Sequence, residues 1–124
     1  MNHYKFKKMI NRPLFIDFSL YAHDDPDFKQ ELIALMVKDL QELQSSLQLS
    51  MQLNEISLYR KACHKMNSTL NILGDKEFLD IVEEIKLDNT PGEKVAFFTR
   101  MCTEIINSLE LDRTGKNNES NPLI

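Results

Sequence analysis

The chain has 124 residues, which suits one domain with a hydrophobic core of its own. Its 15 basic and 19 acidic residues give a net charge of −4, which argues against a nucleic-acid-binding protein. Hydrophobic residues make up 42% of the chain, and only three glycines and four prolines interrupt it. This composition favours a globular, helical protein over a turn-rich β fold.

The sequence shows no apolar run near the roughly 20 residues that a membrane span needs, and no signal peptide is recognised. We therefore expect a cytoplasmic protein that does not enter a membrane. Its two cysteines, Cys63 and Cys102, are expected to be reduced and packed on apolar helix faces. No CxxC or Cys/His spacing indicates a metal site.

The N-terminal part of the chain divides into two segments. Residues 1–12 carry four basic residues and no acid, and are expected to form a flexible leader. Pro13 then introduces a short apolar stretch, 14–22, which is predicted to be a short helix packing across the end of the domain.

A long helix is predicted for residues 26–53. Asp25 is a good N-cap and Pro26 suits the first helical position. The apolar residues that follow have nearly alternating spacings of three and four, which is typical of a helix in a bundle. They are Phe28, Leu32, Leu35, Met36, Leu40, Leu43, Leu47 and Met51.

The next segment, 55–74, reads as one amphipathic helix that Asn54 caps and Gly74 ends in a left-handed conformation. His64 lies at the centre of its polar face, with Arg60, Lys61, Asn67, Ser68 and Asn71 within about 60°. The opposite face is predicted to be buried and carries Tyr59, Ala62, Cys63, Met66, Leu70 and Leu73. Lys65 adds a third cation beside His64, and no acid is expected nearby.

Two further helices complete the pattern. Asp75 is predicted to cap the first, whose buried stripe is Phe78, Leu79, Ile81, Val82 and Ile85. After a turn at 88–89, the capping box 90–93 begins the last helix, which is expected to end at 109–111. This helix should bury Val95, Phe98, Met101, Cys102, Ile105 and Leu109. Residues 112–124 are predicted to be a disordered tail.

Together these elements predict an all-α protein, in which residues 13–111 form an antiparallel up-down four-helix bundle with a short extra N-terminal helix. Common enzyme signatures are missing: no Gly-rich phosphate loop, GxSxG, HExxH or Glu-x-x-His pair is present. His3 and His23 are expected to be solvated. The short polar side chains of Asn67, Ser68 and Asn71 leave room beside His64 for another protein.

The segment 64–74, HKMNSTLNILG, resembles the signature of histidine phosphotransfer domains. In that family the residue two positions after the phosphorylated histidine is usually apolar, and a Lys and a Gly usually follow it directly. A second Gly lies ten residues after the histidine. Met66 and Gly74 match this pattern, while Asn67 and Ser68 stand where Lys and Gly are usual. The resemblance extends over nearly the whole predicted bundle.

The resemblance implies that His64 accepts a phosphoryl group from the aspartyl phosphate of a receiver domain and passes it to another receiver. It also implies that the chain is a carrier without a cofactor of its own, and that the receiver supplies Mg²⁺. The expected partners are response-regulator receiver domains and a sensor or hybrid histidine kinase, with no nucleic acid and no membrane. Arg60, Lys61 and Lys65 are all candidates to replace the missing Lys. Leu58 and Ile72, at the edge of the polar face, are candidates for docking or for core packing.

Two other interpretations remain open. In one, the bundle docks on a receiver or kinase without carrying phosphate. In the other, it is an unrelated helical adaptor or dimerising bundle, in which His64 has no special role.

Overall fold

The computed structural model describes residues 25–88 and 92–114, and this part of the chain is helical without a strand. The predicted leader 1–12, the predicted helix 14–22, and residues 115–124 of the predicted tail lie outside the described residues. The helices are α3 (Pro26–Leu53), α4 (Ser57–Lys65), α5 (Asn67–Leu73), α6 (Lys76–Lys86) and α7 (Gly92–Thr114). The all-helical fold class is confirmed for the described residues.

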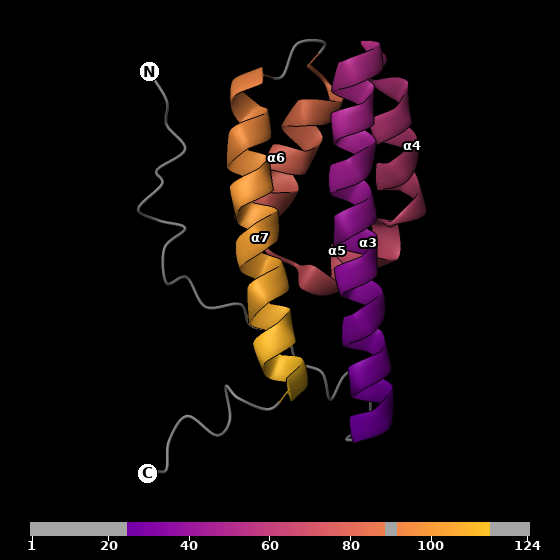
Figure 1. Ribbon diagram of the computed structural model, residues 1–124, viewed down its shortest axis with the longest axis vertical. Helices are drawn as coiled ribbons and strands as arrows, with labels where there is room; N and C mark the ends of the chain where they lie inside the picture. The colour runs from indigo at the N-terminus through magenta and orange to yellow at the C-terminus, as the bar shows by residue number, and fades with distance from the viewer. Residues whose placement is uncertain (1–24, 89–91, 115–124) are drawn as a thin grey trace.

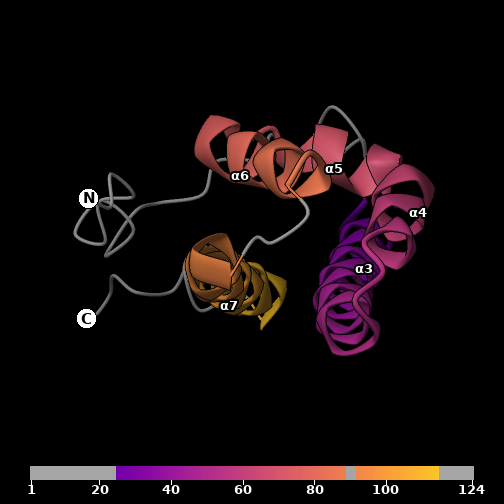
Figure 2. The same ribbon diagram turned by 90° about the horizontal axis from the view of Figure 1, so that it is seen from above.

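The helices pack side by side around one hydrophobic core. α3 contacts both α7 and α4, and α6 contacts α7 and α4 in turn. Figure 2 shows α3, α4, α6 and α7 arranged around a common centre. Near that centre, the ring of Phe98 stacks on Phe78 and meets Tyr59 edge-on, with centroid distances of 5.7 and 6.0 Å. Three helices are thereby joined through aromatic contacts.

α3 begins and ends where the sequence predicts. The Asp25 carboxylate accepts hydrogen bonds from the backbone N–H groups of Asp27 and Phe28, and Pro26 occupies the first turn. These contacts satisfy N–H groups that have no partner within the helix. With 28 residues, α3 is about 42 Å long.

The buried face of α3 differs in part from the predicted stripe. Ile33 and Val37 are buried although the predicted stripe omits them, whereas Phe28, Leu35 and Met51 are exposed. Figure 1 shows that the first turns of α3 extend beyond the end of α5 and lie beside α7. The buried face of α3 is therefore turned around the helix toward Ile33 and Val37 and away from Phe28 and Leu35, relative to the predicted stripe.

The predicted role of Asn54 is wrong. Asn54 ends α3 in the left-handed conformation, with φ of 55°, and its backbone N–H bonds to the α3 carbonyl groups of Ser50 and Met51. α4 starts only at Ser57, without a side-chain cap of its own. Instead, a backbone N–H group in its first turn finds its hydrogen-bond partner on α3: the buried Ser50 hydroxyl accepts a hydrogen bond from the Tyr59 N–H at 2.8 Å.

This contact leads to a stability prediction. Ser50→Ala is expected to lower the free energy of unfolding by about 1 to 2 kcal/mol, because the buried Tyr59 N–H loses its partner. Urea denaturation measures the change, with Ser45→Ala on the exposed side of the same helix as the control. Equal stability of the two variants would show that this hydrogen bond does not hold α4 on α3.

The predicted single helix 55–74 is also corrected. It is divided at Met66, where φ of −100° and ψ of 18° interrupt the helix between α4 and α5. Asn67, Ser68 and Thr69 follow the break, and side chains of these types compete with the helix for backbone hydrogen bonds. Thr69 donates its hydroxyl hydrogen to Asp39 of α3 at 2.6 Å, which ties α5 to α3.

The second half of the domain follows the predictions more closely. Gly74 adopts the left-handed conformation, with φ of 59°, and the Asp75 side chain caps α6 through the Phe78 N–H. The predicted stripe of α6 is buried except for Leu79, which is half-buried against the core. Residues 90 and 91 of the predicted capping box lie outside the described residues.

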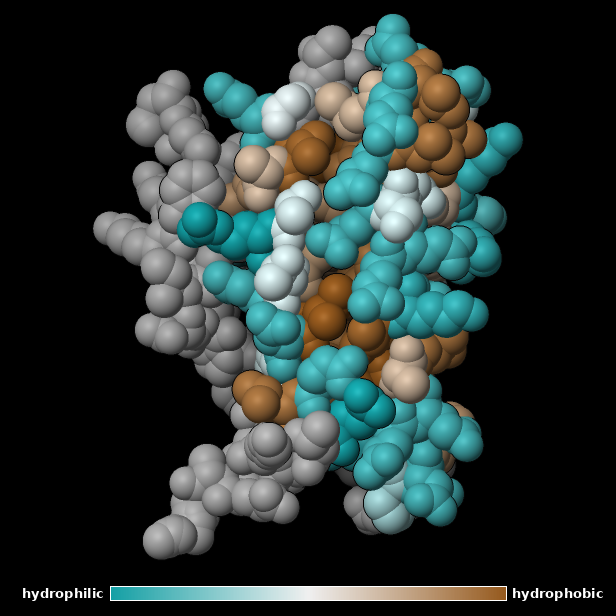
Figure 3. Space-filling view, in the orientation of Figure 1, coloured by the Kyte–Doolittle hydropathy of each residue, from teal (hydrophilic) through white to brown (hydrophobic). Residues whose placement is uncertain are grey.

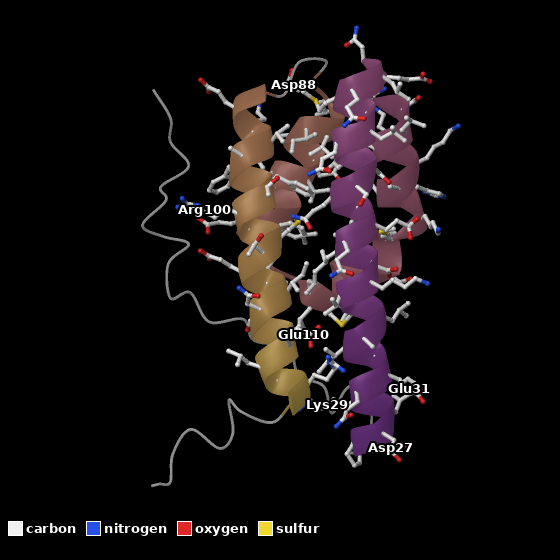
Figure 4. The ribbon with its side chains drawn as sticks, in the orientation of Figure 1. Asp27, Lys29, Glu31, Asp88, Arg100 and Glu110 are labelled. Carbon is white, nitrogen blue, oxygen red and sulfur yellow. The ribbon has the colours of Figure 1, made fainter. Side chains whose placement is uncertain are left out.

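α7 continues past its predicted end at 109–111 and reaches Thr114. Its predicted stripe is buried apart from the half-buried Val95, and Phe97 is buried as well. Asp112 pairs with Lys29 of α3 at 3.5 Å, and Figure 4 shows Lys29 between the ends of the two helices. Arg113 pairs with Glu110. These two contacts extend the helix into what was predicted to be a disordered tail.

Candidate functional site

His64 is exposed one residue before the end of α4. Its orientation follows from the burial of the opposite face: Tyr59, Ala62 and Cys63 are all buried in the core. Because α4 is fixed on that side, the imidazole must point outward. Within residues 25–88 and 92–114, His64 makes no hydrogen bond and no ion pair.

The other predicted residues of the polar face are also exposed. Arg60 and Lys61 precede His64 on α4, whereas Asn67, Ser68 and Asn71 belong to α5. Met66 at the break and the predicted apolar residues of α5, Leu70 and Leu73, are buried. The exposed face is therefore shared by two short helices, and the break at Met66 falls directly after Lys65.

The prediction of a surround without an acid is wrong. Glu42 of α3 accepts a hydrogen bond from the Lys65 ammonium group at 2.8 Å. This hydrogen bond raises the pKa of Lys65 above its ordinary value. A carboxylate is thus bound to the residue that follows His64, and it neutralises one of the three predicted cations.

Asp39 brings a second carboxylate to the same side of α3, where it binds Thr69. Neither Asp39 nor Glu42 is close to His64 in the sequence, so the predicted set of site residues omits both. They lie three positions apart and therefore share one face of α3. That spacing is the signal that could have indicated acidic contacts to a neighbouring helix.

Arg60 is directed toward α6. Its Nε donates a hydrogen bond to the backbone carbonyl of Lys86 at 2.7 Å, in the last turn of that helix. A cation at this end of a helix is favourable because the last carbonyl groups lack partners within the helix. Arg60 therefore contributes to holding α4 against α6.

Lys61 differs from the other two cations. It is exposed, and its ammonium group makes no hydrogen bond and no ion pair within the part of the chain that the structure describes. Lys61 also lies three residues before His64, a spacing that makes side chains neighbours on a helix surface.

The buried side of α4 offers polar groups but no accessible nucleophile. The Tyr59 hydroxyl donates to the Val82 carbonyl at 3.1 Å. Burial raises the pKa of Cys63 from its ordinary value of 9.0 to about 11, so its thiol stays protonated at neutral pH. Both cysteines are free and buried, in agreement with the prediction that they have a packing role.

The raised thiol pKa predicts how stability depends on pH. Between pH 9 and about 11 the unfolded chain releases the Cys63 proton while the folded chain keeps it, so the free energy of unfolding should fall as pH rises. Burial also raises the pKa of Tyr59, which acts in the same direction. Thermal melts at pH 8 to 11 should show a falling Tm, with a shallower fall for Cys63→Ala. A Tm independent of pH over this range would contradict the prediction.

Among the described residues, no group of three or more His, Cys, Asp or Glu side chains is placed to hold a metal ion. None of the described helices has both the length and the apolar character needed to cross a membrane.

Comparison with known proteins adds no assignment. No family model matches the sequence, and no curated protein or solved structure matches it significantly.

Proposed function

We propose that this protein is a histidine phosphotransfer carrier that accepts a phosphoryl group on His64 from a receiver-domain aspartate and passes it to another receiver. The observation that carries the proposal is the placement of His64. Its imidazole is exposed and has no partner among the described residues, on a helix whose other face is fixed in the core. This arrangement presents a nucleophile to another protein without a supporting active site.

The proposal includes an antiparallel up-down bundle in which α4 and α5 together form one of four legs. The colours of Figure 1 support this topology, because α3 and α7 lie side by side and their chain directions are opposite. The contacts of α3 with α4 and of α6 with α7 agree with neighbours joined in sequence.

The chemistry requires little from this chain. The lone pair of one imidazole nitrogen attacks the phosphorus of the aspartyl phosphate and forms a P–N bond. The P–O bond to the aspartate breaks, and the carboxylate leaves with the electron pair. In the second transfer, the aspartate of another receiver attacks the phosphorus and forms a P–O bond, and the P–N bond to His64 breaks. Because phosphoryl transfer depends on positioning and charge neutralisation, the receiver's own Mg²⁺ and Lys can supply the remaining groups.

Apolar side chains on α3, α4 and α5 offer a docking surface for the receiver. Leu58 and Ile72 are half-buried, and Leu58 lies two turns before Lys65 on the side of α4 from which Lys65 contacts α3. Leu49 of α3 is exposed next to Ser50, whose hydroxyl contacts α4. Figure 3 shows hydrophobic atoms among polar ones near the top of the molecule, where α3 ends and α4 begins. Such a surface, with an apolar centre and a polar rim, suits a transient partner.

The direct test is a transfer assay with purified receiver domains that have been phosphorylated by acetyl phosphate in the presence of Mg²⁺. The expected result is acid-labile, alkali-stable phosphate on this protein, with a matching loss from the receiver. If no receiver transfers phosphate although at least one binds, the carrier proposal is wrong.

A second candidate is a module that binds a receiver without carrying phosphate. Two observations favour it: Asn67 stands where the family usually has Lys, and Glu42 neutralises Lys65. Both reduce the positive charge available to a phosphoryl group. Receiver binding without labelling supports this candidate, and the absence of any binding supports an unrelated adaptor.

A further inference from the structure

We infer that Lys61 is the residue of this chain that binds the phosphoryl group carried by His64. The inference depends on the proposed function, because it assigns a role within the same site. It names one residue where the sequence leaves three cations as equal candidates.

A cation near His64 has a defined task. Phosphorylation adds a phosphoryl group with up to two negative charges to the exposed imidazole, and a nearby ammonium or guanidinium group stabilises that state. The position at which the family usually places this cation holds Asn67, which carries no charge. Another side chain must therefore supply the positive charge if this chain supplies it at all.

Two of the three candidates are already engaged. The Lys65 ammonium group is bound by Glu42 at 2.8 Å, and a phosphoryl group would have to compete with that carboxylate. Adjacent residues on a helix also point in different directions, which turns Lys65 away from His64. Arg60 is held at its Nε by the Lys86 carbonyl, on the side of α6.

Lys61 satisfies the requirements that the other two do not. It lies three positions before His64, at a distance of about 5 to 6 Å between Cβ atoms. Side chains on a helix lean toward its N-terminus, so the imidazole of His64 lies over the turn that contains Lys61. The Lys61 side chain is exposed and without a partner in the described ranges 25–88 and 92–114, so it can move to a phosphoryl oxygen without breaking an existing contact.

The test uses phosphoramidate, a small donor that phosphorylates histidine directly and releases ammonia as its own P–N bond breaks. His3→Gln and His23→Gln are introduced into the full chain, which leaves His64 as its single histidine. A ³¹P NMR titration then gives the pKa of the phosphoryl group. A neighbouring cation favours the dianion, so Lys61→Met should raise this pKa by about 0.3, an effect that added salt should reduce.

Matched variants separate charge from structure. Lys61→Arg should leave the pKa of the phosphoryl group as it is in the parent protein. Lys65→Met should change this pKa by less than half as much as Lys61→Met. Glu42→Gln in the Lys61→Met background should lower the phosphoryl pKa again, because it removes a negative charge from this side of the bundle and leaves the Lys65 charge unpaired. A merely structural role for Lys61 would not produce this pattern.

The inference is overturned if Lys61→Met leaves the phosphoryl titration unchanged, or if Lys65→Met has the larger effect. Its failure is distinct from failure of the proposed function. A phosphoryl group that reaches His64 from phosphoramidate but is never exchanged with a receiver contradicts the carrier role alone. A normal exchange with an unchanged titration contradicts only the assignment of Lys61.

Discussion

Leu70→Asp is expected to unfold the domain at room temperature. Leu70 is 5% exposed in the core that all five helices share, so the new carboxylate would be buried without a partner. Burial of an unpaired charge costs several kcal/mol, and the cavity left by the lost leucine atoms adds to this. The sum is comparable to the whole stability of a typical domain, about 5 to 15 kcal/mol.

The neighbouring residue supplies a matched control. Asn71→Asp adds the same charge one position further along α5, where the side chain is exposed. This variant should melt within a few degrees of the wild type. Circular dichroism at 222 nm and thermal denaturation measure both. A cooperative melt of Leu70→Asp near the wild-type Tm would mean that the buried and exposed faces of α5 are reversed. Met66→Asp, at a site that is 2% exposed, should behave like Leu70→Asp.

His64→Gln is expected to abolish labelling by a phosphorylated receiver without a change in fold. Glutamine keeps a polar side chain of similar length but has no nucleophilic ring nitrogen. The substitution should alter the free energy of unfolding by less than about 0.5 kcal/mol, because His64 is exposed and contacts no polar partner in the described residues. Acid-labile phosphate and the melting curve are measured on the same preparation.

The other two histidines provide the control for this experiment. His3→Gln and His23→Gln, tested singly, should accept phosphate as the wild type does. Labelling of His64→Gln that disappears only when His3 or His23 is replaced would assign the carrier role to that residue instead. Unchanged receiver binding by unlabelled His64→Gln would show that docking and transfer are separate properties of this surface.

The exposed face that carries His64 could be predicted from the sequence, but the partners of its charged side chains could not. Periodicity alone placed His64, Asn67 and Ser68 outward, because a helix repeats every 3.6 residues whatever surrounds it. The contacts of Lys65 with Glu42 and of Arg60 with Lys86 join residues more than 20 positions apart. Only the register between helices brings such groups together.

Some helix boundaries likewise follow from the local sequence, whereas another depends on contacts between helices. The cap at Asp25, the left-handed Gly74 and the cap at Asp75 involve residues within four positions of one another, so the sequence by itself determined them. Asn54 suits either end of a helix by its local chemistry. The tertiary structure decided in favour of the end of α3, because the Ser50 hydroxyl already satisfies the first turn of α4.

The sequence by itself determined that this protein is helical and that a histidine lies on an outer face, since both follow from local propensity and from the spacing of apolar residues. Tertiary structure decided which face of α3 is buried, that the histidine-bearing helix breaks at Met66, and that Lys61 alone of three cations lacks a partner among the described residues. The physical reason is that burial, ion pairing and hydrogen bonding between helices depend on where neighbouring helices end and in which register they pack.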